Sequence, residues 1–305
     1  MSHKIRQSAD HIWMTEPVLF HCNKQTMATN TYQSDDPPDI EAVQAAALKE
    51  FHAFRDRLVS AGVNVTTVLG HSDSPDDIFP NWASTHEDGK GGRFIVYYPM
   101  LNENRRIERR PEMTALLERQ YDVALDMSHY EERDLALEST SALWIDRVHK
   151  VAYSSHSARA NQDLGREWCA FMGYQFVPFE TRNHAGKPVY HTDVMMFIGT
   201  EFIGVCLECI VPEDRARVRA SLEATGREII EIKNEQLLDF CGNCLEVVAR
   251  DGTKKLVMSA SAYQAYTDEQ KEKFLKYVSE IVYSDLTTIQ KYGGGAARCM
   301  MMEMF

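Results

Sequence analysis

What the sequence lacks excludes several classes of protein. It has no long uninterrupted apolar run, and residues 1–10 lack the apolar core of a signal peptide, so we expect a soluble, cytoplasmic protein that contacts no membrane. It also lacks an excess of basic residues, because 33 Lys and Arg stand against 45 Asp and Glu, for a formal net charge of -12. Such a surface repels a phosphate backbone, so we expect no nucleic-acid partner.

A disulfide framework is also missing. The 305 residues hold seven cysteines, an odd number in a long chain, which favours reduced thiols. With 44% apolar and 26% charged residues the chain can bury a large core, as one large domain or two of average size. The repeats described next favour a single catalytic domain over residues 1–305.

Four candidate hairpins recur along the chain at intervals of roughly 50 to 60 residues. Each pairs two short apolar strands around a turn rich in Gly, Asp or Thr. The strand pairs are 79–82 with 94–97, 142–145 with 151–153, 194–198 with 202–206, and 244–248 with 255–258. A near-constant period indicates that one structural unit is repeated.

Helical patterns and further strands complete each unit as strand, strand, helix, strand. The predicted helices cover 106–120, 160–172, 212–224 and 262–276, and the predicted closing strands include 122–127 and 227–232. A fifth unit can be assembled from strand 297–305, strand 12–19, helix 40–60 and strand 63–68. The predicted fold class is therefore α/β, a five-bladed pseudo-fivefold β/α propeller of ββαβ units with a central channel for a small polar ligand; a mixed α/β sandwich is the alternative.

Cys299 is the first candidate for chemistry. A glycine run, Gly293 to Gly295, precedes it, and glycine lets the backbone turn tightly and approach a ligand closely. Arg298 adjoins the sulfur and is expected to favour the thiolate over the thiol. These features favour a presented nucleophile; a free cysteine packed in the core is the alternative.

Acidic residues and one histidine recur just before predicted first strands. His191 and Asp193 are two residues apart, so in an extended segment both side chains point to the same side. Glu138 and the pair Asp76 and Asp77 occupy similar places in other units. A turn or helix-cap role is the alternative for each acid taken alone.

These motifs, in this order, resemble the guanidino-group-modifying superfamily, which includes arginine deiminases, dimethylarginine dimethylaminohydrolases and amidinotransferases. The similarity is closest to its amidinotransferase-like and citrulline-utilising hydrolase branch and runs through nearly the whole chain. It rests on segments 14–33, 75–82, 137–140, 190–196 and 293–299.

The resemblance implies a five-bladed propeller of the pentein type and assigns roles to residues. Cys299 would attack the central carbon of a guanidinium or ureido group and form a covalent thiouronium, and His191 would transfer protons. Glu138 would orient His191, while Asp193 and Asp77 would bind the nitrogens of the substrate. Asn81 and Asn243 are further expected substrate contacts. The chemistry requires no metal and no organic cofactor.

Two departures from the family pattern bear on the substrate. Citrulline-type relatives typically read Phe-Pro-Asn-Asn-Trp, whereas this chain has one asparagine, Asn81, between Pro80 and Trp82. Those relatives also read His-Thr-Asn where this chain has Asp193. A carboxylate pairs better with a cationic guanidinium than with a neutral urea, so we expect arginine-like substrates rather than citrulline.

Several alternatives remain open. Cys206 and Cys209 with Cys241 and Cys244 form two Cys-x-x-Cys pairs, a zinc-binding pattern, but the long separation and a strand position for the first pair disfavour zinc. The alternative from another class of function is a propeller that binds a small molecule without catalysing a reaction. The sequence does not distinguish hydrolysis from amidino transfer, and it leaves the oligomeric state open, a homo-oligomer included. Three arginines, Arg93, Arg159 and Arg182, are candidates for binding the amino-acid head of the substrate.

Overall fold

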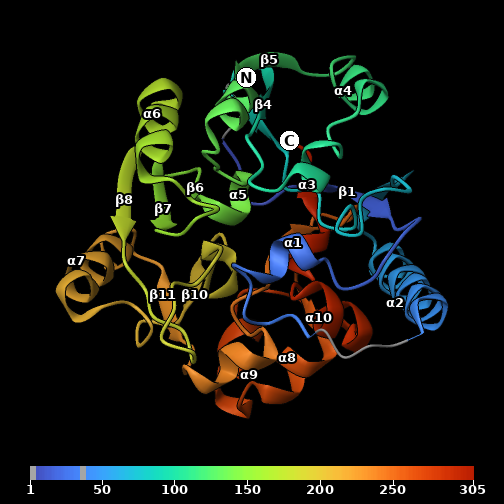
Figure 1. The fold of residues 1–305 in the computed structure, drawn as a ribbon. Coiled ribbons are helices and arrows are strands. Elements are labelled where there is room, and N and C mark those ends of the chain that lie inside the picture. The colour runs from blue at the N-terminus through green and yellow to red at the C-terminus, as the bar shows by residue number, and fades with distance from the viewer. Residues whose placement is uncertain (1–4, 35–38) are drawn as a thin grey trace.

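The computed structural model describes residues 5–34 and 39–305. Five three-stranded sheets follow one another around a ring, with the longer helices on the outside (Figure 1). In every sheet the middle strand pairs antiparallel with one neighbour and parallel with the other. The five-bladed propeller predicted from the repeats is thus confirmed.

The sheets divide the chain into equivalent units. Their strands are β3 (Ala83–Glu87), β4 (Arg93–Tyr97) and β5 (Asp122–Asp126); β6 (Trp144–Asp146), β7 (Val151–Ser155) and β8 (Gln175–Phe179); β9 (Met196–Ile198), β10 (Phe202–Val205) and β11 (Glu228–Glu231); β12 (Leu245–Val248), β13 (Lys254–Ser259) and β14 (Glu280–Ser284); and β15 (Met302–Glu303), β1 (His11–Glu16) and β2 (Asn64–Leu69).

A helical segment connects the middle strand of each unit to its parallel partner, as a parallel pair requires. These segments contain α2 (Ile40–Ser60), α3 (Glu103–Arg106) with α4 (Pro111–Leu117), α6 (Gln162–Met172), α7 (Pro212–Glu223), and α8 (Ala260–Ala265) with α9 (Asp268–Leu275). Short elements lie between the units: α5 (Ser139–Ala142), α10 (Thr287–Gly293), and the 3-10 turns η1 (Ser128–Arg133), η2 (Thr192–Val194), η3 (Glu235–Asp239) and η4 (Arg298–Met300). The short helix α1 (Lys24–Met27) lies within the fifth unit, between β1 and β2.

Two predicted helices are each divided in two, for local reasons. Proline has no N–H and is favoured in the first turn of a helix, so α4 begins anew at Pro111. Thr267 forms a capping box with Gln270, which starts α9 separately from α8.

The ring closes where distant parts of the chain meet. β1 pairs antiparallel with β15, through Ile12 with Glu303 and Trp13 with Met302, and it pairs parallel with β2 along its whole length. The fifth unit assembled from both ends of the sequence is therefore confirmed. The predicted C-terminal strand 297–305 shortens to β15, and Cys299 lies in η4 just before it.

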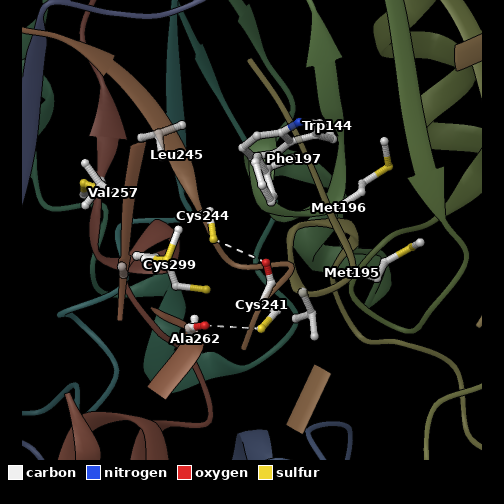
Figure 2. Packing of buried hydrophobic residues seen from close by; sticks show 14 of the residues in the cluster. Trp144, Met195, Met196, Phe197, Cys241, Cys244, Leu245, Val257, Ala262 and Cys299 are labelled. Atoms are coloured by element: carbon white, nitrogen blue, oxygen red, sulfur yellow. Dashed lines mark hydrogen bonds between the residues drawn. The ribbon is translucent and has the colours of Figure 1, made fainter. Parts of the chain in front are cut away.

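Apolar side chains fill the space between sheets and helices. One large buried cluster joins α2, the third and fourth units and the segment around Cys299, and Figure 2 shows Cys299, Cys241 and Cys244 within it. Amphipathic α6 turns Leu164 and Trp168 inward, which anchors a second cluster. This packing fixes the sheets, and hence the loops that precede their first strands. No helix among the described residues is long and apolar enough to cross a membrane.

Candidate active site

Five loops, one from each unit, carry the candidate site residues. Asn81, Glu138, His191, Asn243 and Cys299 each lie shortly before the antiparallel strand of their sheet: β3, β6, β9, β12 and β15. All five side chains are buried. Asn81 and Cys299 lie in turns where strands were predicted, and the strands β3 and β15 begin two and three residues later. The repeated fold therefore brings together residues more than 200 positions apart in sequence.

Cys299 is held by two polar neighbours. Asn243 Nδ2 donates to Cys299 Sγ at 3.1 Å, and the thiol in turn faces Asp193 Oδ2 at 3.6 Å. The backbone N–H of Cys299 donates to Asn243 Oδ1 at 3.3 Å. The sulfur therefore has a fixed position between an amide and a carboxylate.

The resting form of Cys299 is the thiol. Burial raises its pKa, the Asp193 carboxylate raises it further, and the opposing effect of Arg298 is smaller. The Arg298 guanidinium is turned away to Thr140 Oγ1 at 2.6 Å and to the carbonyl of Met301 at 2.9 Å, and it lies over the ring of Trp144. The expectation that Arg298 makes the resting sulfur a thiolate is therefore wrong, because burial outweighs its charge.

His191 and Glu138 form a buried pair. His191 Nε2 lies 2.8 Å from Glu138 Oε2, and an ionised carboxylate only accepts, so Nε2 carries the proton. Nδ1 of His191 is buried and has no hydrogen-bond partner. The ring thus presents an unpaired nitrogen, the arrangement needed for proton transfer. The sequence predicts an extended segment over both residues, but only His191 has an extended backbone. Asp193 lies in η2, so the chain turns between the two side chains.

Glu138 is ionised despite complete burial. Burial by itself raises the pKa of Glu138, but Arg159, the hydrogen bond from His191 and the charge of Arg105 together lower it to about 2. Nη1 of Arg105 and Nη1 of Arg159 lie 3.6 Å and 3.8 Å from Glu138 Oε2. Oε1 accepts the backbone N–H of Leu101 at 3.2 Å. The carboxylate is therefore a fixed negative charge behind His191.

A small cavity adjoins Cys299 and His191. Its volume is about 10 Å3, close to the minimum that holds one water molecule. The residues that line it are Asn30, Asp76, Phe79, Asn81, Arg105, Arg159, Tyr190, His191, Gly293, Gly295 and Cys299. The candidates named from the sequence that line this cavity are Cys299, His191, Asn81, Asp76 and Arg159.

Asp76 lines the cavity and Asp77 does not. Asp77 Oδ2 accepts the backbone N–H of His71, and burial raises the pKa of this carboxyl to about 6. Asp76 Oδ2 accepts from Asn23 Nδ2 at 2.8 Å and from Thr26 Oγ1 at 3.0 Å, while Oδ1 is buried and unpartnered. The geometry therefore replaces Asp77 by its neighbour Asp76 as the acid that faces the cavity.

Asp193 and Asn243 lie behind the sulfur, outside the set of residues that line the cavity. Burial raises the pKa of Asp193, and the charges of His191 and Arg298 lower it by less. Oδ1 of Asp193 has no hydrogen-bond partner although the residue is fully buried. An unpaired buried carboxylate oxygen is costly, which makes this atom available to a donor brought by a ligand.

An N-terminal segment, residues 23–33 and called here the cover segment, forms part of the cavity wall. Arg159 Nη2 donates to the carbonyl of Thr26 at 2.7 Å and its Nε donates to Thr29 Oγ1 at 2.9 Å. Asn30 Nδ2 donates to the carbonyl of Gly294 at 3.1 Å. In Figure 1 α1, which belongs to this segment, lies near the middle of the ring.

The glycine run allows this close contact. Gly294 has a φ of +63° and ends α10 in the left-handed conformation. A Cβ there would lie 2.4 Å from Asn30 Nδ2, and one on Gly295 would lie 3.1 Å from the ring of Phe79 and 3.2 Å from Cys299 Cβ. The glycines thus let the chain deliver Cys299 beneath the cover segment.

The four cysteines of the two Cys-x-x-Cys pairs are buried free thiols. Cys209 Sγ lies 3.2 Å from the carbonyl of Cys206, and Cys244 Sγ lies 3.3 Å from the carbonyl of Cys241. Within residues 5–34 and 39–305, no group of three or more His, Cys, Asp and Glu is placed to hold a metal ion.

Sequence reasoning left several cavity residues without an assigned role. Arg105, Asn30 and Tyr190 have none in the motif analysis, although Tyr190 adjoins His191 and its hydroxyl donates to the carbonyl of Gly294 at 2.6 Å. Of the three candidate head-group arginines, only Arg159 lines the cavity. Arg93 instead donates to the terminal residue Phe305 at 2.8 Å. A buried arginine far from any motif gives no signal of its own in a single sequence.

Comparison with known proteins decides the family. Residues 16–305 match the model of the family described as N,N dimethylarginine dimethylhydrolase, eukaryotic. The chain belongs to this family. The description of that family names a hydrolase that acts on N,N-dimethylarginine. No curated protein matches the chain in a sequence comparison.

Solved structures share the fold. The apo structure of ArgZ, an arginine dihydrolase from the ornithine-ammonia cycle in cyanobacteria, superimposes with a TM-score of 0.75 at 15% identity, covering 96% of this chain and 40% of that one. The N-terminal domain of ArgZ bound to product gives 0.74 at 15% identity, with 96% of each chain covered. A histidine-to-glycine variant of dimethylarginine dimethylaminohydrolase, in an adduct with S-methyl-L-thiocitrulline, gives 0.67 at 17% identity, covering 97% of this chain and 100% of that one.

This chain therefore spans 40% of the ArgZ apo chain and corresponds in extent to its N-terminal domain.

Proposed function

We propose that this protein hydrolyses the guanidino group of an arginine-type α-amino acid through a covalent intermediate on Cys299. The observation that carries the proposal is the cavity itself. Its lining includes Cys299, His191 with an unpaired Nδ1, and Asp76 with an unpaired Oδ1, and this set supports the proposal. A nucleophile, a proton carrier and a carboxylate for a cationic ligand therefore line one cavity.

The substrate itself activates the nucleophile in this account. A guanidinium carbon is deactivated by resonance, so the attacking sulfur has to be a thiolate, yet the resting Cys299 is a thiol. A guanidinium bound beside the sulfur and against Asp193 adds a positive charge that lowers the pKa of the thiol. The S–H proton then passes to Nδ1 of His191, and the imidazolium is stabilised by Glu138.

Bond changes balance over two half-reactions. The thiolate adds to the guanidinium carbon, the C–N bond to the departing amine breaks, and His191 returns its proton to that amine, leaving a thiouronium on Cys299. In the second half His191 takes a proton from water, the hydroxide adds to the same carbon, and the C–S bond breaks. The ureido product leaves after its hydroxyl proton passes to solvent, and the proton on His191 returns to the sulfur, which restores the thiol of Cys299 for the next substrate.

Recognition of the amino-acid head falls to the charged wall of the cavity. Asp76 supplies an acceptor for an α-ammonium group, and Arg105 and Arg159 supply positive charge for an α-carboxylate. The cavity of about 10 Å3 is far too small for arginine, so the cover segment has to move outward for entry. Its bonds to Arg159 and Gly294 are the ones that open.

The test is a panel of candidate substrates. The full-length protein is incubated with arginine, mono- and dimethylated arginines, citrulline and agmatine, with and without glycine as acceptor, and the products are identified by mass spectrometry. We expect ureido product and free ammonia or methylamine from at least one guanidino amino acid, independent of glycine. Product that forms only with glycine would mean amidino transfer, and no product from any compound would favour a binding role.

Asp193 sets the preference for a cation over a neutral urea. We expect Asp193→Asn to lower kcat/KM for the guanidino substrate by roughly 100-fold, because it loses one of the two charges in a buried ion pair with the substrate. Turnover of citrulline, measured in the same preparation, is expected to fall far less or to rise. Unaltered activity on both compounds would contradict this role of Asp193.

A further inference from the structure

We propose that Asn243 is a positioning residue that holds the sulfur of Cys299 and stabilises its thiolate, rather than a contact for the substrate. The inference deepens the proposed function, since it concerns the same nucleophile. The side-chain amide of Asn243 contacts Cys299 with both of its polar atoms, and its Nδ2 also donates to the carbonyl of Asp193. Sequence reasoning had expected it at the substrate.

The contacts of Asn243 fix which way its amide points. Oδ1 accepts the backbone N–H of Cys299 at 3.3 Å, and this leaves Nδ2 to donate to Cys299 Sγ at 3.1 Å and to the carbonyl of Asp193 at 3.1 Å. The carbonyl of Asn243 accepts the N–H of Arg298 at 3.4 Å. The residue is fully buried. Rotating the amide would place Oδ1 against two acceptors, so the donor stays aimed at the sulfur.

The packing of the backbone around Gly242 also holds Asn243 in this position. A Cβ on Gly242 would lie 2.1 Å from the carbonyl oxygen of Val194 and 2.6 Å from the Cα of Met195, so only glycine lets this turn press on the segment after Asp193. Asn243 therefore ties the loops of three units together, those that carry Asp193, Asn243 and Cys299.

The charges around the sulfur explain what the amide does. Burial and Asp193 disfavour the thiolate, whereas the amide of Asn243 favours it by a hydrogen bond to the charged form. A donor already in place needs no reorganisation when the proton leaves, so its stabilisation is available at the moment of attack. The same N–H keeps the sulfur at one position in the cavity wall, so that the sulfur is oriented toward the carbon of a bound guanidino group.

Alkylation by iodoacetamide needs no substrate, so this test of Asn243 does not depend on the outcome of the substrate panel. The rate of modification of Cys299, followed by peptide mass spectrometry between pH 6 and 10, reports the fraction of thiolate. For Asn243→Ala we expect the rate at each pH below the plateau to fall by roughly 10-fold or more, because the hydrogen bond to the anion is lost. Asn243→Asp keeps the shape and places a carboxylate at the sulfur, so we expect a larger fall.

The control variant is Asn161→Ala, which removes the N-cap of α6 and has no contact with the cavity. It is expected to lower thermal stability and leave the alkylation profile unchanged. If Asn243→Ala does not fold, Asn243→Asp, checked by its thermal unfolding midpoint, carries the test. Alkylation profiles of folded Asn243 variants that match the native profile would overturn the proposal, as would a rise in KM with kcat unchanged.

Discussion

Replacing Cys299 with alanine is expected to abolish turnover of every guanidino substrate, with a loss of roughly 100,000-fold or more in kcat. Cys299 carries the only thiol among the residues that line the cavity, and His191 and Asp76 serve the reaction as proton carrier and as acceptor for the substrate. Substrate binding is expected to persist, since the carboxylates and arginines of the cavity are untouched. Rates measured by product formation and binding measured by calorimetry separate the two effects.

A second buried cysteine serves as the control. Cys169 lies in α6, is almost fully buried and is a free thiol, but it belongs to a different core cluster. We expect Cys169→Ala to lose some stability through the small cavity it leaves and to keep its turnover. An active Cys299→Ala protein, or an inactive but folded Cys169→Ala protein, would contradict the assignment of the nucleophile.

Glu138→Gln is expected to lower kcat by roughly 1,000- to 10,000-fold with little change in KM. An amide in place of the carboxylate can hold the wrong tautomer of His191 and cannot stabilise the imidazolium. It also leaves Arg105 and Arg159 without the charge that lies 3.6 Å and 3.8 Å from them. Steady-state kinetics at neutral pH measures this loss.

Acid stability gives the same substitution a second, independent readout. The pKa of Glu138 is about 2 in the folded protein against an ordinary value of 4.5, so its ionised form contributes stability above pH 4.5. That contribution is lost as the pH falls from 4.5 towards 2. We expect the native protein to lose more stability than Glu138→Gln across this window, measured by urea unfolding at successive pH values.

Glu50→Gln is the matched control for both readouts. Glu50 lies in α2, away from the cavity, and accepts backbone N–H groups of Thr288 and Ile289. Turnover is expected to be retained in this variant. A Glu138→Gln protein with native kcat would show that His191 needs no carboxylate partner.

The fold was predictable because its signal is repeated. Each unit carries its own turn residues and alternating apolar strands, so an error in one hairpin does not disturb the period set by the others. The boundaries were less predictable, because the residues before each first strand are as apolar as the strand itself. Phe79 and Trp82, for example, are buried in a turn ahead of β3. Tertiary packing around the cavity, which local pattern does not reveal, decides where these strands begin.

The candidate site, like the fold, could be predicted from the sequence only in part. Glu138, His191 and Cys299 stand in ordered motifs, so the resemblance located them, and the structure brings His191 and Glu138 into contact. Asp76 and Asp77 are adjacent and chemically identical, and only the turn geometry shows which one faces inward. The charge state of Cys299 was also out of reach, because it depends on complete burial, which outweighs the neighbouring arginine visible in the sequence.

Trapping the covalent intermediate tests the central claim most directly. A His191→Gly protein lacks the proton carrier of both half-reactions, so it is mixed with S-methyl-L-thiocitrulline, whose methanethiolate leaves without a proton from His191. The thiouronium is then expected to form and to persist, because no base activates water for the second half-reaction. Acid quenching followed by peptide mass spectrometry would then show the mass of the substrate less its leaving group on the peptide that contains Cys299, and no addition in the variant that also carries Cys299→Ala. Turnover by the native protein with no adduct on Cys299 in either protein, or an adduct on another residue, would contradict the account.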